Sequence, residues 1–260
     1  MTAADAVYVY GIVPSGTSGA IFAGVTGMDA AAVRLVDAEG VAAIASFVPL
    51  AEFDTDALEQ NLKDVAWLEQ KVAAHNRVLS AAVGKATVLP LRFGAIYRGE
   101  EDVRAMLGER HDFAVRLGRL EGLLELGVKA LLDAQALRAR LSASRGVDAD
   151  ESGGRAYMLR RRLERELDEE VRAFAGSCAE ASHERLAAAA VDARANPVQA
   201  PEVAGGEMIL NGAYLVAAGR ERALRQAVSE LEERFGADGV TYELTGPWPP
   251  YNFAGEEPEE

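Results

Sequence analysis

Cysteine is almost absent from this sequence, which has Cys178 as its one thiol in 260 residues. A single cysteine cannot form an internal disulfide or a Cys-rich metal site, and such usage fits a reducing compartment. Cys178 shares the spacing of the apolar residues around it, and no neighbour is evidently placed to activate the thiol. We therefore interpret Cys178 as an inert core residue rather than as a nucleophile.

Long apolar runs are also lacking. No window approaches the roughly 18 consecutive apolar residues that a bilayer-spanning helix needs. The N-terminal region has neither the basic flank nor the long apolar run of a secretory signal peptide. We therefore expect a cytoplasmic protein with no membrane partner.

Positive charge is scarce, because 27 Lys and Arg residues stand against 41 Asp and Glu residues, which gives a formal net charge of −14. Nucleic-acid-binding proteins normally present a basic face or stripe to the phosphate backbone, so we expect no nucleic-acid partner. The hydrophobic content of 49% is nevertheless that of a folded protein with a sizeable core.

Sequence signatures of catalysis and cofactor binding are missing as well. The histidines His75, His111 and His183 are too scattered for a metal-ligand motif, and a hydrogen-bonded, half-buried structural role is favoured for His75. Gly84 and Lys85 lack the earlier glycine and the following Ser or Thr of a phosphate-binding loop. No Gly-x-Ser-x-Gly elbow occurs. We therefore predict no catalytic residue, no metal site, no cofactor and no enzymatic activity.

The first half of the chain predicts an α+β layer with a mixed sheet. Short runs rich in β-branched and aromatic residues indicate strands, and a turn ending in Gly40 indicates a hairpin. Apolar residues that recur every three or four positions indicate one long helix. The predicted elements are a strand over residues 6–13, hairpin strands over 33–36 and 41–48, a helix over 56–82, a strand over 87–97 that is broken at Pro90 and Gly94, and helical segments after residue 100.

The second half predicts a ferredoxin-like unit. Its strands and helices follow the order βαββαβ, with two loop-like stretches over residues 142–154 and 196–206. The predicted elements are a strand over residues 125–130, a long helix over 159–181, a possible strand over 185–193, a strand over 208–217, a helix over 224–235 and a strand over 240–244.

These patterns divide the chain into two domains of an α+β protein. We expect an N-terminal α+β domain over residues 1–118 and a C-terminal ferredoxin-like domain over residues 119–253 that includes an aromatic arm. Residues 254–260 form a Glu-rich acidic tail.

The aromatic arm is the stretch over residues 244–253, which contains three of the nine prolines. Proline fixes φ and removes a backbone donor, so we expect a stiff, extended segment in which helix and central strand both stop. Trp248, Tyr251 and Phe253 need an apolar surface. Folding back over its own domain, with Trp248 as the anchor, is favoured over display to a partner. A ligand for a proline-recognising protein is a third possibility.

Arg92 and Phe93 form a second candidate site. Arg92 stands between Leu91 and Phe93 in an otherwise apolar segment, so its charge would need a partner if it were buried. A structural ion pair is favoured over a binding role, because buried charges are kept only when they are paired.

Four motifs are spread along the chain. They read Tyr-Val-Tyr-Gly-Ile-Val at 8–13, Leu-Pro-Leu-Arg-Phe-Gly-Ala at 89–95, Leu-Asn-Gly-Ala-Tyr-Leu-Val at 210–216 and Leu-Thr-Gly-Pro-Trp-Pro-Pro-Tyr-Asn-Phe at 244–253. Together they resemble the gas vesicle protein F/L family nearly end to end, with the second and fourth motifs as the specific ones. This chain has Ala95 where family members often have Thr, and Gly212 where Ala is common. The motifs do not separate the F type from the L type.

The resemblance implies a non-enzymatic accessory or minor structural protein that is needed to assemble the gas vesicle shell. It also implies an N-terminal α+β domain, a ferredoxin-like C-terminal domain and contact with the small, hydrophobic major shell protein and with other accessory proteins. The rival interpretation is a small-molecule-binding or catalytic ferredoxin-like protein with a pocket near Arg92 and the glycine-rich loop over residues 16–27. A deep pocket with convergent polar groups near Arg92 would favour the rival.

Overall fold

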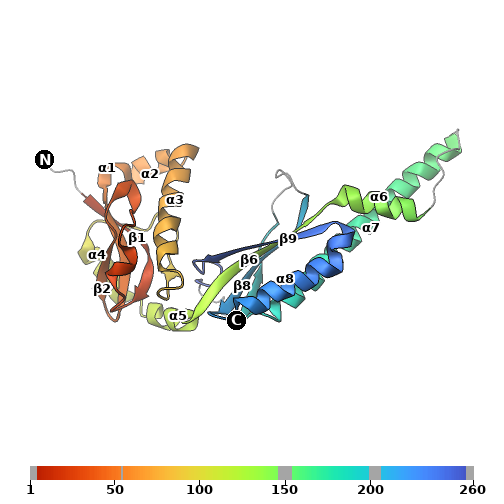
Figure 1. The fold of residues 1–260 in the computed structure, drawn as a ribbon. Helices are drawn as coiled ribbons and strands as arrows, with labels where there is room; N and C mark the ends of the chain where they lie inside the picture. Colours follow the sequence, from red (N-terminus) through yellow and green to blue (C-terminus); the bar gives the residue numbers. More distant parts are fainter. Residues whose placement is uncertain (1–4, 54, 146–153, 199–205, 256–260) are drawn as a thin grey trace. The chain divides into compact units, whose positions relative to one another are not determined.

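The computed structural model describes residues 5–53, 55–145, 154–198 and 206–255, which form two compact units of an α+β protein (Figure 1). The first unit comprises Met1–Glu125 and Pro247–Glu260, and the second comprises Leu126–Gly246. The expected division placed the boundary after residue 118 and the aromatic arm in the second domain. The structure instead groups residues 247–253 of the arm with the first unit, because these residues make contacts there.

An antiparallel sheet forms the centre of the first unit; the mixed sheet that was expected is wrong, because the described strands β1 to β5 pair only antiparallel. Its path runs β2-β3-β1-β4, and β5 also pairs with β1. Strand β1 is therefore the central strand, and its pairing with β3 shifts register between Val9 and Gly11. A Cβ atom on Gly11 would lie 2.8 Å from the Leu89 carbonyl oxygen, so only glycine lets β4 approach here. The strands are β1 (Asp5–Pro14), β2 (Arg34–Ala38), β3 (Val41–Pro49), β4 (Leu89–Pro90) and β5 (Ile96–Tyr97).

The hairpin predicted from the sequence is confirmed. Strands β2 and β3 pair from Arg34 with Ala45 to Ala38 with Val41. The two turn residues, Glu39 and Gly40, have φ values of 49° and 80°. Two successive positive φ angles match the right-handed twist of the strands, which is why glycine is favoured at such a turn.

Helix α3 covers the sheet of the first unit and packs on β1. One continuous helix over residues 56–82 was expected, and this is wrong because the chain leaves the helix after Asn61. The Asp64 Oδ1 atom accepts the backbone N–H groups of Ala66 and Trp67, and this N-cap starts a new helix. The helices are α1 (Leu50–Phe53), α2 (Thr55–Asn61), α3 (Val65–Ala82), α4 (Glu100–Glu109) and α5 (Asp112–Leu120), with 3-10 turns η1 (Gly19–Phe22) and η2 (Met28–Ala30).

Aromatic rings and aliphatic side chains from the sheet and α3 fill the core of the first unit. Tyr8, Ile44, Val78 and Leu79 are all fully buried in this cluster. Burying one such side chain contributes about 1.5–3 kcal/mol to the free energy of unfolding. The breaks expected at Pro90 and Gly94 in the strand over residues 87–97 are confirmed, because β4 ends at Pro90 and β5 begins only at Ile96, after a turn at Phe93 and Gly94.

The second unit is a four-stranded sheet with the strand order β7-β8-β6-β9. Strands β7 and β8 are antiparallel. Helices α7 and α8 pack on β8 and on each other, and α6 packs along α7 (Figure 1). The elements are β6 (Leu123–Leu132), α6 (Ala134–Ser144), α7 (Gly154–Ala187), β7 (Asp192–Ala195), β8 (Glu207–Ala217), α8 (Glu221–Phe235), the 3-10 turn η3 (Gly236–Asp238) and β9 (Val240–Trp248).

Most predicted elements of the second unit are confirmed, with two differences. Helix α6 was not expected, and its start is capped by the Asp133 carboxylate, which accepts the Ala136 N–H group. The possible strand over residues 185–193 begins only at Asp192, because α7 continues to Ala187. The predicted loops over residues 142–154 and 196–206 lie largely outside the described residues. None of the described helices is long and apolar enough to cross a membrane.

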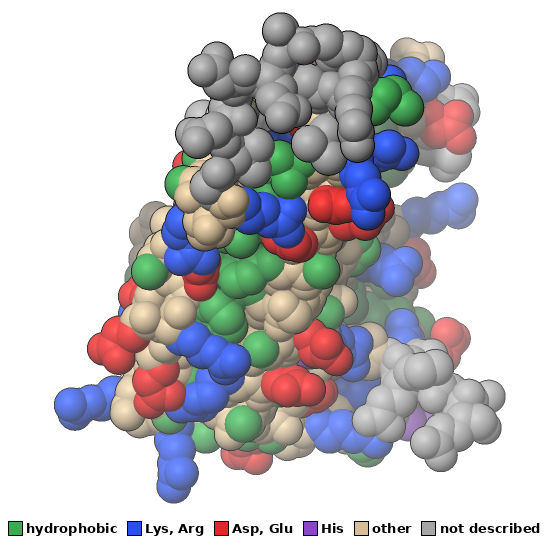
Figure 2. All heavy atoms as spheres, turned by 90° about the vertical axis from the view of Figure 1, so that its right-hand side faces the viewer, with side chains coloured by type: hydrophobic (Ala, Val, Ile, Leu, Met, Phe, Trp, Pro, Cys, Tyr) green, Lys and Arg blue, Asp and Glu red, His purple; other side chains and the backbone are tan. Residues whose placement is uncertain are grey.

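Both charge signs alternate on the outer face of α7. Arg162 pairs with Glu166 one turn along the helix at 2.9 Å, and Arg138 of α6 pairs with Asp168 of α7. Figure 2 shows one face of the molecule on which Lys and Arg side chains lie among Asp and Glu side chains, with hydrophobic side chains between them. Exposed pairs contribute only about 0.2–1 kcal/mol each, so their main effect is to keep this surface solvated.

Candidate functional site

A cavity of about 710 Å³ lies in the first unit beside the segment that joins β4 to β5. We call it the Arg92 pocket. Residues 90–95 form one wall, α4 and α5 contribute another, and residues near the C-terminus complete the rim. Its lining combines the guanidinium groups of Arg92, Arg110 and Arg116 with the apolar side chains of Phe93, Met106 and Phe113.

Backbone hydrogen bonds to β1 hold the wall formed by residues 90–95. The Leu91 N–H group donates to the Tyr10 carbonyl oxygen at 3.0 Å, and the Val9 N–H group donates to the Ala95 carbonyl oxygen at 2.8 Å. The Gly94 N–H group donates to the Tyr8 hydroxyl at 3.3 Å. Both ends of the segment are thus fixed to the central strand, and the residues between them form a loop that presents Arg92 and Phe93.

Arg92 is exposed, and it forms no hydrogen bond or ion pair with any residue that the structure describes. A structural ion pair was favoured for this residue on the assumption of burial. The assumption is wrong, because the loop carries the side chain outward to the pocket and to solvent. The neighbouring Phe93 is half-buried and packs against the core of the first unit.

Arg110 and Arg116 share the carboxylate of Asp112. The Asp112 Oδ2 atom lies 2.8 Å from Arg116 Nη1 and 3.3 Å from Arg110 Nη2. Partial burial tends to raise the pKa of the Asp112 carboxyl, but the hydrogen bonds and charges of Arg116 and Arg110 outweigh it and hold that pKa below its usual value. One negative charge therefore faces two positive ones beside the pocket.

Phe113 forms the floor under these two arginines. Its side chain is buried, and its ring centroid lies 4.8 Å from the Arg110 guanidinium carbon and 6.0 Å from that of Arg116. Guanidinium groups stack favourably on aromatic faces, which limits the positions that the arginines can take. The pocket therefore places positive groups over an apolar surface.

The C-terminal segment, residues 249–255, forms the rim of the pocket. A stiff, extended arm was expected over residues 244–253, and this is confirmed as far as Trp248 and wrong beyond it. Strand β9 continues through Pro247 to Trp248, which an edge strand tolerates because one of its sides needs no partner. Turns then follow, in which the Tyr251 N–H group donates to the Pro249 carbonyl and the Phe253 N–H group to that of Pro250.

Specific polar contacts bind the C-terminal segment to the first unit. The Asn252 side chain donates to Glu125 Oε1 at 2.6 Å, and its backbone N–H group donates to Glu125 Oε2 at 3.0 Å. The Tyr251 hydroxyl donates to Asn76 Oδ1 at 3.1 Å, and the Arg116 guanidinium donates to the carbonyl oxygen of Ala254. The segment thus covers the first unit.

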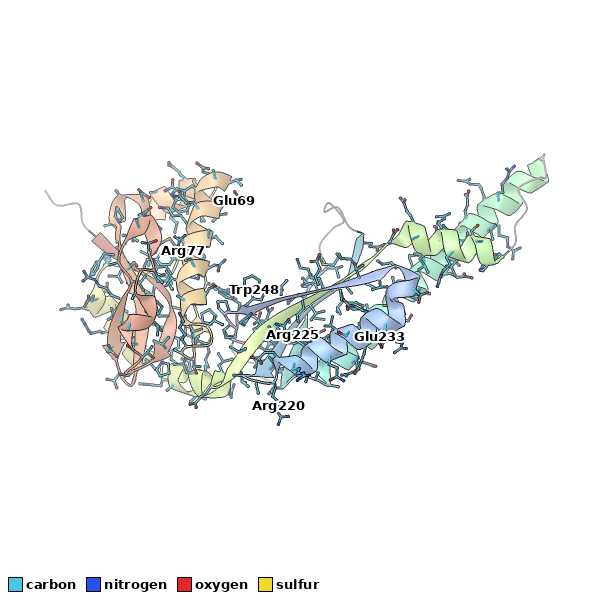
Figure 3. All side chains as sticks on the ribbon, in the orientation of Figure 1. Glu69, Arg77, Arg220, Arg225, Glu233 and Trp248 are labelled. Atoms are coloured by element: carbon cyan, nitrogen blue, oxygen red, sulfur yellow. The ribbon has the colours of Figure 1, made fainter. Side chains whose placement is uncertain are left out.

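Trp248, which was expected to be the anchor of the segment, is only partly covered. The residue is 47% exposed at the end of β9 (Figure 3). Tyr251 is 40% exposed, but its ring stacks on His75 with 6.4 Å between centroids. Tyr251, Asn252 and Ala254 thus each make specific contacts that hold the segment in place.

His75 lies beneath this contact and is only 2% exposed, so the expected half-buried position is wrong while the structural hydrogen bond is present. Its Nδ1 atom lies 2.8 Å from the Tyr8 hydroxyl, and its Nε2 atom has no hydrogen-bond partner among the described residues. Burial lowers the pKa of His75 to about 4, against a smaller opposing effect of the Leu91 backbone. Burial also raises the pKa of Tyr8.

The remaining chemical candidates do not converge on the pocket. Cys178 is fully buried, and its sulfur lies 3.8 Å from the Tyr242 hydroxyl, which is 2.7 Å from the Ser182 hydroxyl. His183 Nδ1 lies 3.0 Å from the Tyr214 hydroxyl. Within the described ranges, no group of three or more His, Cys, Asp and Glu side chains is placed to hold a metal ion.

Sequence reasoning missed Arg110, Arg116 and Glu125. The spacing of four residues between Asp112 and Arg116 could have identified their helical ion pair. No sequence pattern links Glu125 to Asn252, because 127 positions separate them. Sequence reasoning also missed Lys71, which is 3% exposed and forms ion pairs with Asp29 and Glu52.

Comparison with known proteins gives a consistent result along the whole chain. The family model described as gas vesicle synthesis protein GvpL/GvpF matches residues 6–255. Gas vesicle protein L of Streptomyces sp. (strain CB03234) is 33% identical over 251 residues, which cover 95% of this chain and 92% of that protein. Gas vesicle protein F of Haloferax mediterranei is 26% identical over 253 residues, with 96% and 93% covered.

Two solved structures share the fold. The crystal structure of GvpF from Anabaena sp. PCC7120 matches with a TM-score of 0.69 and 20% identity, over 98% of each chain. That of GvpF from Microcystis aeruginosa matches with a TM-score of 0.67 and 20% identity, over 96% of this chain and 99% of the other.

Proposed function

Because the chain belongs to the GvpL/GvpF family of gas vesicle proteins, we propose that it is an accessory or minor structural protein required for gas vesicle assembly. The observation that carries this proposal is the match of the family model to residues 6–255, which leaves almost no part of the chain outside the resemblance. The family is not a known family of enzymes, and we propose that the chain acts without catalysis.

The proposed partners are the hydrophobic major shell protein and the other accessory proteins of the vesicle. A net charge of −14 would keep a complex with an aggregation-prone protein dispersed in the cytoplasm. The strands β2 and β7 lie at sheet edges, where a partner strand could pair. These features support a chaperone-like or scaffolding contact.

We further propose that the two compact units act as two domains, the second of them ferredoxin-like. The element order and the strand order β7-β8-β6-β9 support this assignment. The residues proposed to contact partners are Arg92 and Phe93 at the pocket and Trp248, Tyr251 and Phe253 near the C-terminus.

The Arg92 pocket favours a second candidate function, which is binding of a small molecule. Its volume of about 710 Å³ falls within the roughly 300–1,000 Å³ typical of ligand sites. Three arginines converge on it, as a site for an anionic metabolite would require. This candidate does not explain the family match, so it ranks second.

Deletion of the gene in a vesicle-forming host tests the proposed function. We expect the loss of buoyant vesicles, restoration by the wild-type gene, and recovery of shell or accessory proteins when the tagged chain is isolated from lysate. Intact vesicles in the deletion strain, together with isolation of the chain without any vesicle protein, would show that the proposal is wrong.

A further inference from the structure

We propose that the Arg92 pocket binds a carboxylate-bearing segment of a partner protein and holds an apolar side chain of that segment against Phe93, Met106 and Phe113. The inference rests on the proposed function, because an assembly factor must recognise protein segments. It goes beyond that function by assigning a site and the chemistry of its ligand.

The first argument is the charge of the pocket. Arg92, Arg110 and Arg116 line it, and no carboxylate is among the described lining residues. The adjacent Asp112 supplies one negative charge for Arg110 and Arg116 together. The positive charge of the pocket contrasts with the net charge of −14 on the whole chain, and it is complementary to an acidic ligand.

The second argument is the hydrogen-bonding capacity that the protein leaves open. Arg92 has no partner among the described residues, and a guanidinium offers N–H donors in a planar fork that fits a carboxylate. Arg116 directs one Nη atom to Asp112 and the other to the Ala254 carbonyl, so it is held in place by the protein. Arg92 is therefore the group best able to bind a ligand, and Arg116 helps to build the wall.

The third argument is the apolar surface beside the charges. Phe113 is buried, while Phe93 and Met106 are half-buried at the wall of a cavity of about 710 Å³. A small inorganic anion would leave most of this volume and all of the apolar wall unused. A peptide in which acidic and apolar residues alternate would satisfy both.

Binding of a synthetic peptide to the full chain tests the inference. The probe is fluorescein-labelled Glu-Leu-Glu-Leu-Glu-Leu, and the matched peptide replaces each Glu by Gln. We expect binding of the Glu peptide that weakens with added NaCl, and at least tenfold weaker binding of the Gln peptide. Equal binding of the two peptides would overturn the inference, as would competition by inorganic phosphate at the concentration at which the free Glu peptide competes.

Two arginines that lie close together in the sequence supply the matched variants. Arg92→Gln should weaken binding of the Glu peptide about tenfold, since a charge-assisted hydrogen bond is lost. Arg98→Gln removes the same charge from an exposed residue outside the pocket lining and should leave binding unchanged. Both side chains are exposed, so both variants should keep the wild-type melting temperature. Equal losses in both variants would show that only overall charge matters and would overturn the site.

The acidic residues that follow Gly255 in the sequence could compete for the same arginines. The peptide is therefore also measured against a chain that ends at Gly255. Binding to either chain that depends on Arg92 supports the site, and binding to neither overturns it. This outcome is separate from the deletion experiment, because vesicle loss can occur without a functional pocket, and the peptide can bind without any role in vesicles.

Discussion

At the residue scale, the aromatic rings around His75 determine the protonation state of its imidazole. Its ring lies 5.7 Å from the rings of both Tyr8 and Tyr10 and 6.1 Å from that of Phe93, measured between centroids. With Tyr251 above it and 2% exposure, the side chain has almost no access to water. Such surroundings favour the neutral form, because a charge buried without a partner is costly.

We expect this histidine to make the protein sensitive to acid. The unfolded chain takes up a proton near pH 6.5, whereas burial lowers the pKa of His75 to about 4 in the folded state. The contribution of the neutral His75 side chain to the free energy of unfolding is therefore complete above about pH 6.5 and is lost as the pH falls toward 4. Between pH 7 and pH 4.5 the free energy of unfolding should fall by roughly 2 kcal/mol from this group.

Urea unfolding at the two pH values measures this effect. His75→Gln should lose that part of the pH dependence, while His111→Gln, which changes an exposed histidine, should retain it. If wild type and His75→Gln lost the same free energy between pH 7 and pH 4.5, the buried imidazole would not be the group responsible.

At the scale of elements, the two segments that build the pocket are irregular for the same physical reason. Pro90 ends β4 and Pro249 follows β9, and a proline has no backbone N–H group to continue a sheet ladder. Each segment instead makes a few specific hydrogen bonds, to β1 in one case and to Glu125 and Asn76 in the other. Hydrogen bonds thus fix the positions of these two segments, which do not belong to a helix or a strand.

We expect Asn252 to stabilise the C-terminal segment more than Trp248 does. Glu125 is 4% exposed and accepts hydrogen bonds from the Asn252 side chain and backbone. Asn252→Ala removes the side-chain donor from a buried carboxylate and should cost about 1–3 kcal/mol. Trp248→Ala should cost about 1 kcal/mol or less, because nearly half of the residue is already exposed.

Chemical denaturation of the two variants and the wild type makes this comparison. A larger loss of the free energy of unfolding in Trp248→Ala than in Asn252→Ala would show that the tryptophan is the anchor of the segment.

At the scale of the whole molecule, the first compact unit is built from two stretches of the chain that are not consecutive in sequence. The first unit combines Met1–Glu125 with Pro247–Glu260 from the last part of the chain. The residues between these two stretches, Leu126–Gly246, form the second unit. We therefore expect the stability of the first unit to depend on the C-terminal segment, although the two are far apart in sequence.

Truncation after Gly246 should lower the stability of the first unit selectively. It removes the contacts of Tyr251, Asn252 and Ala254, and we expect a decrease of several degrees in the melting temperature of that unit. Trp67 of α3 lies in the first unit and reports its unfolding by fluorescence. Full-length Trp248→Phe provides the matched reference with Trp67 as the remaining tryptophan.

Hydrogen exchange of α8 amides follows the second unit in the same samples and should be unchanged. A chain that ends at Gly255 keeps the contacts and should melt like the full chain. Loss of protection in α8, or an unchanged Trp67 transition after truncation at Gly246, would contradict the assignment of the segment to the first unit.

Local sequence patterns predicted much of the fold. The hairpin around Gly40 follows from the backbone freedom of glycine, and α8 follows from apolar residues that recur with the helical period. Asp64 is a favourable N-cap residue and indicates the break before α3. The prediction missed this break because apolar residues recur with the helical period on both sides of it. For Arg92 and Phe93, the sequence identified the residues but not their exposure.

The sequence by itself determined the α+β class, most of the strands and helices, and the resemblance to the gas vesicle family, because backbone preferences and side-chain periodicity act over a few residues. Only the tertiary structure decided that Arg110 and Arg116 join Arg92 around one cavity, that His75 is buried, and that the C-terminal segment completes the first unit. Those outcomes depend on contacts such as Asn252 with Glu125, whose partners are distant in sequence, and no local pattern encodes them.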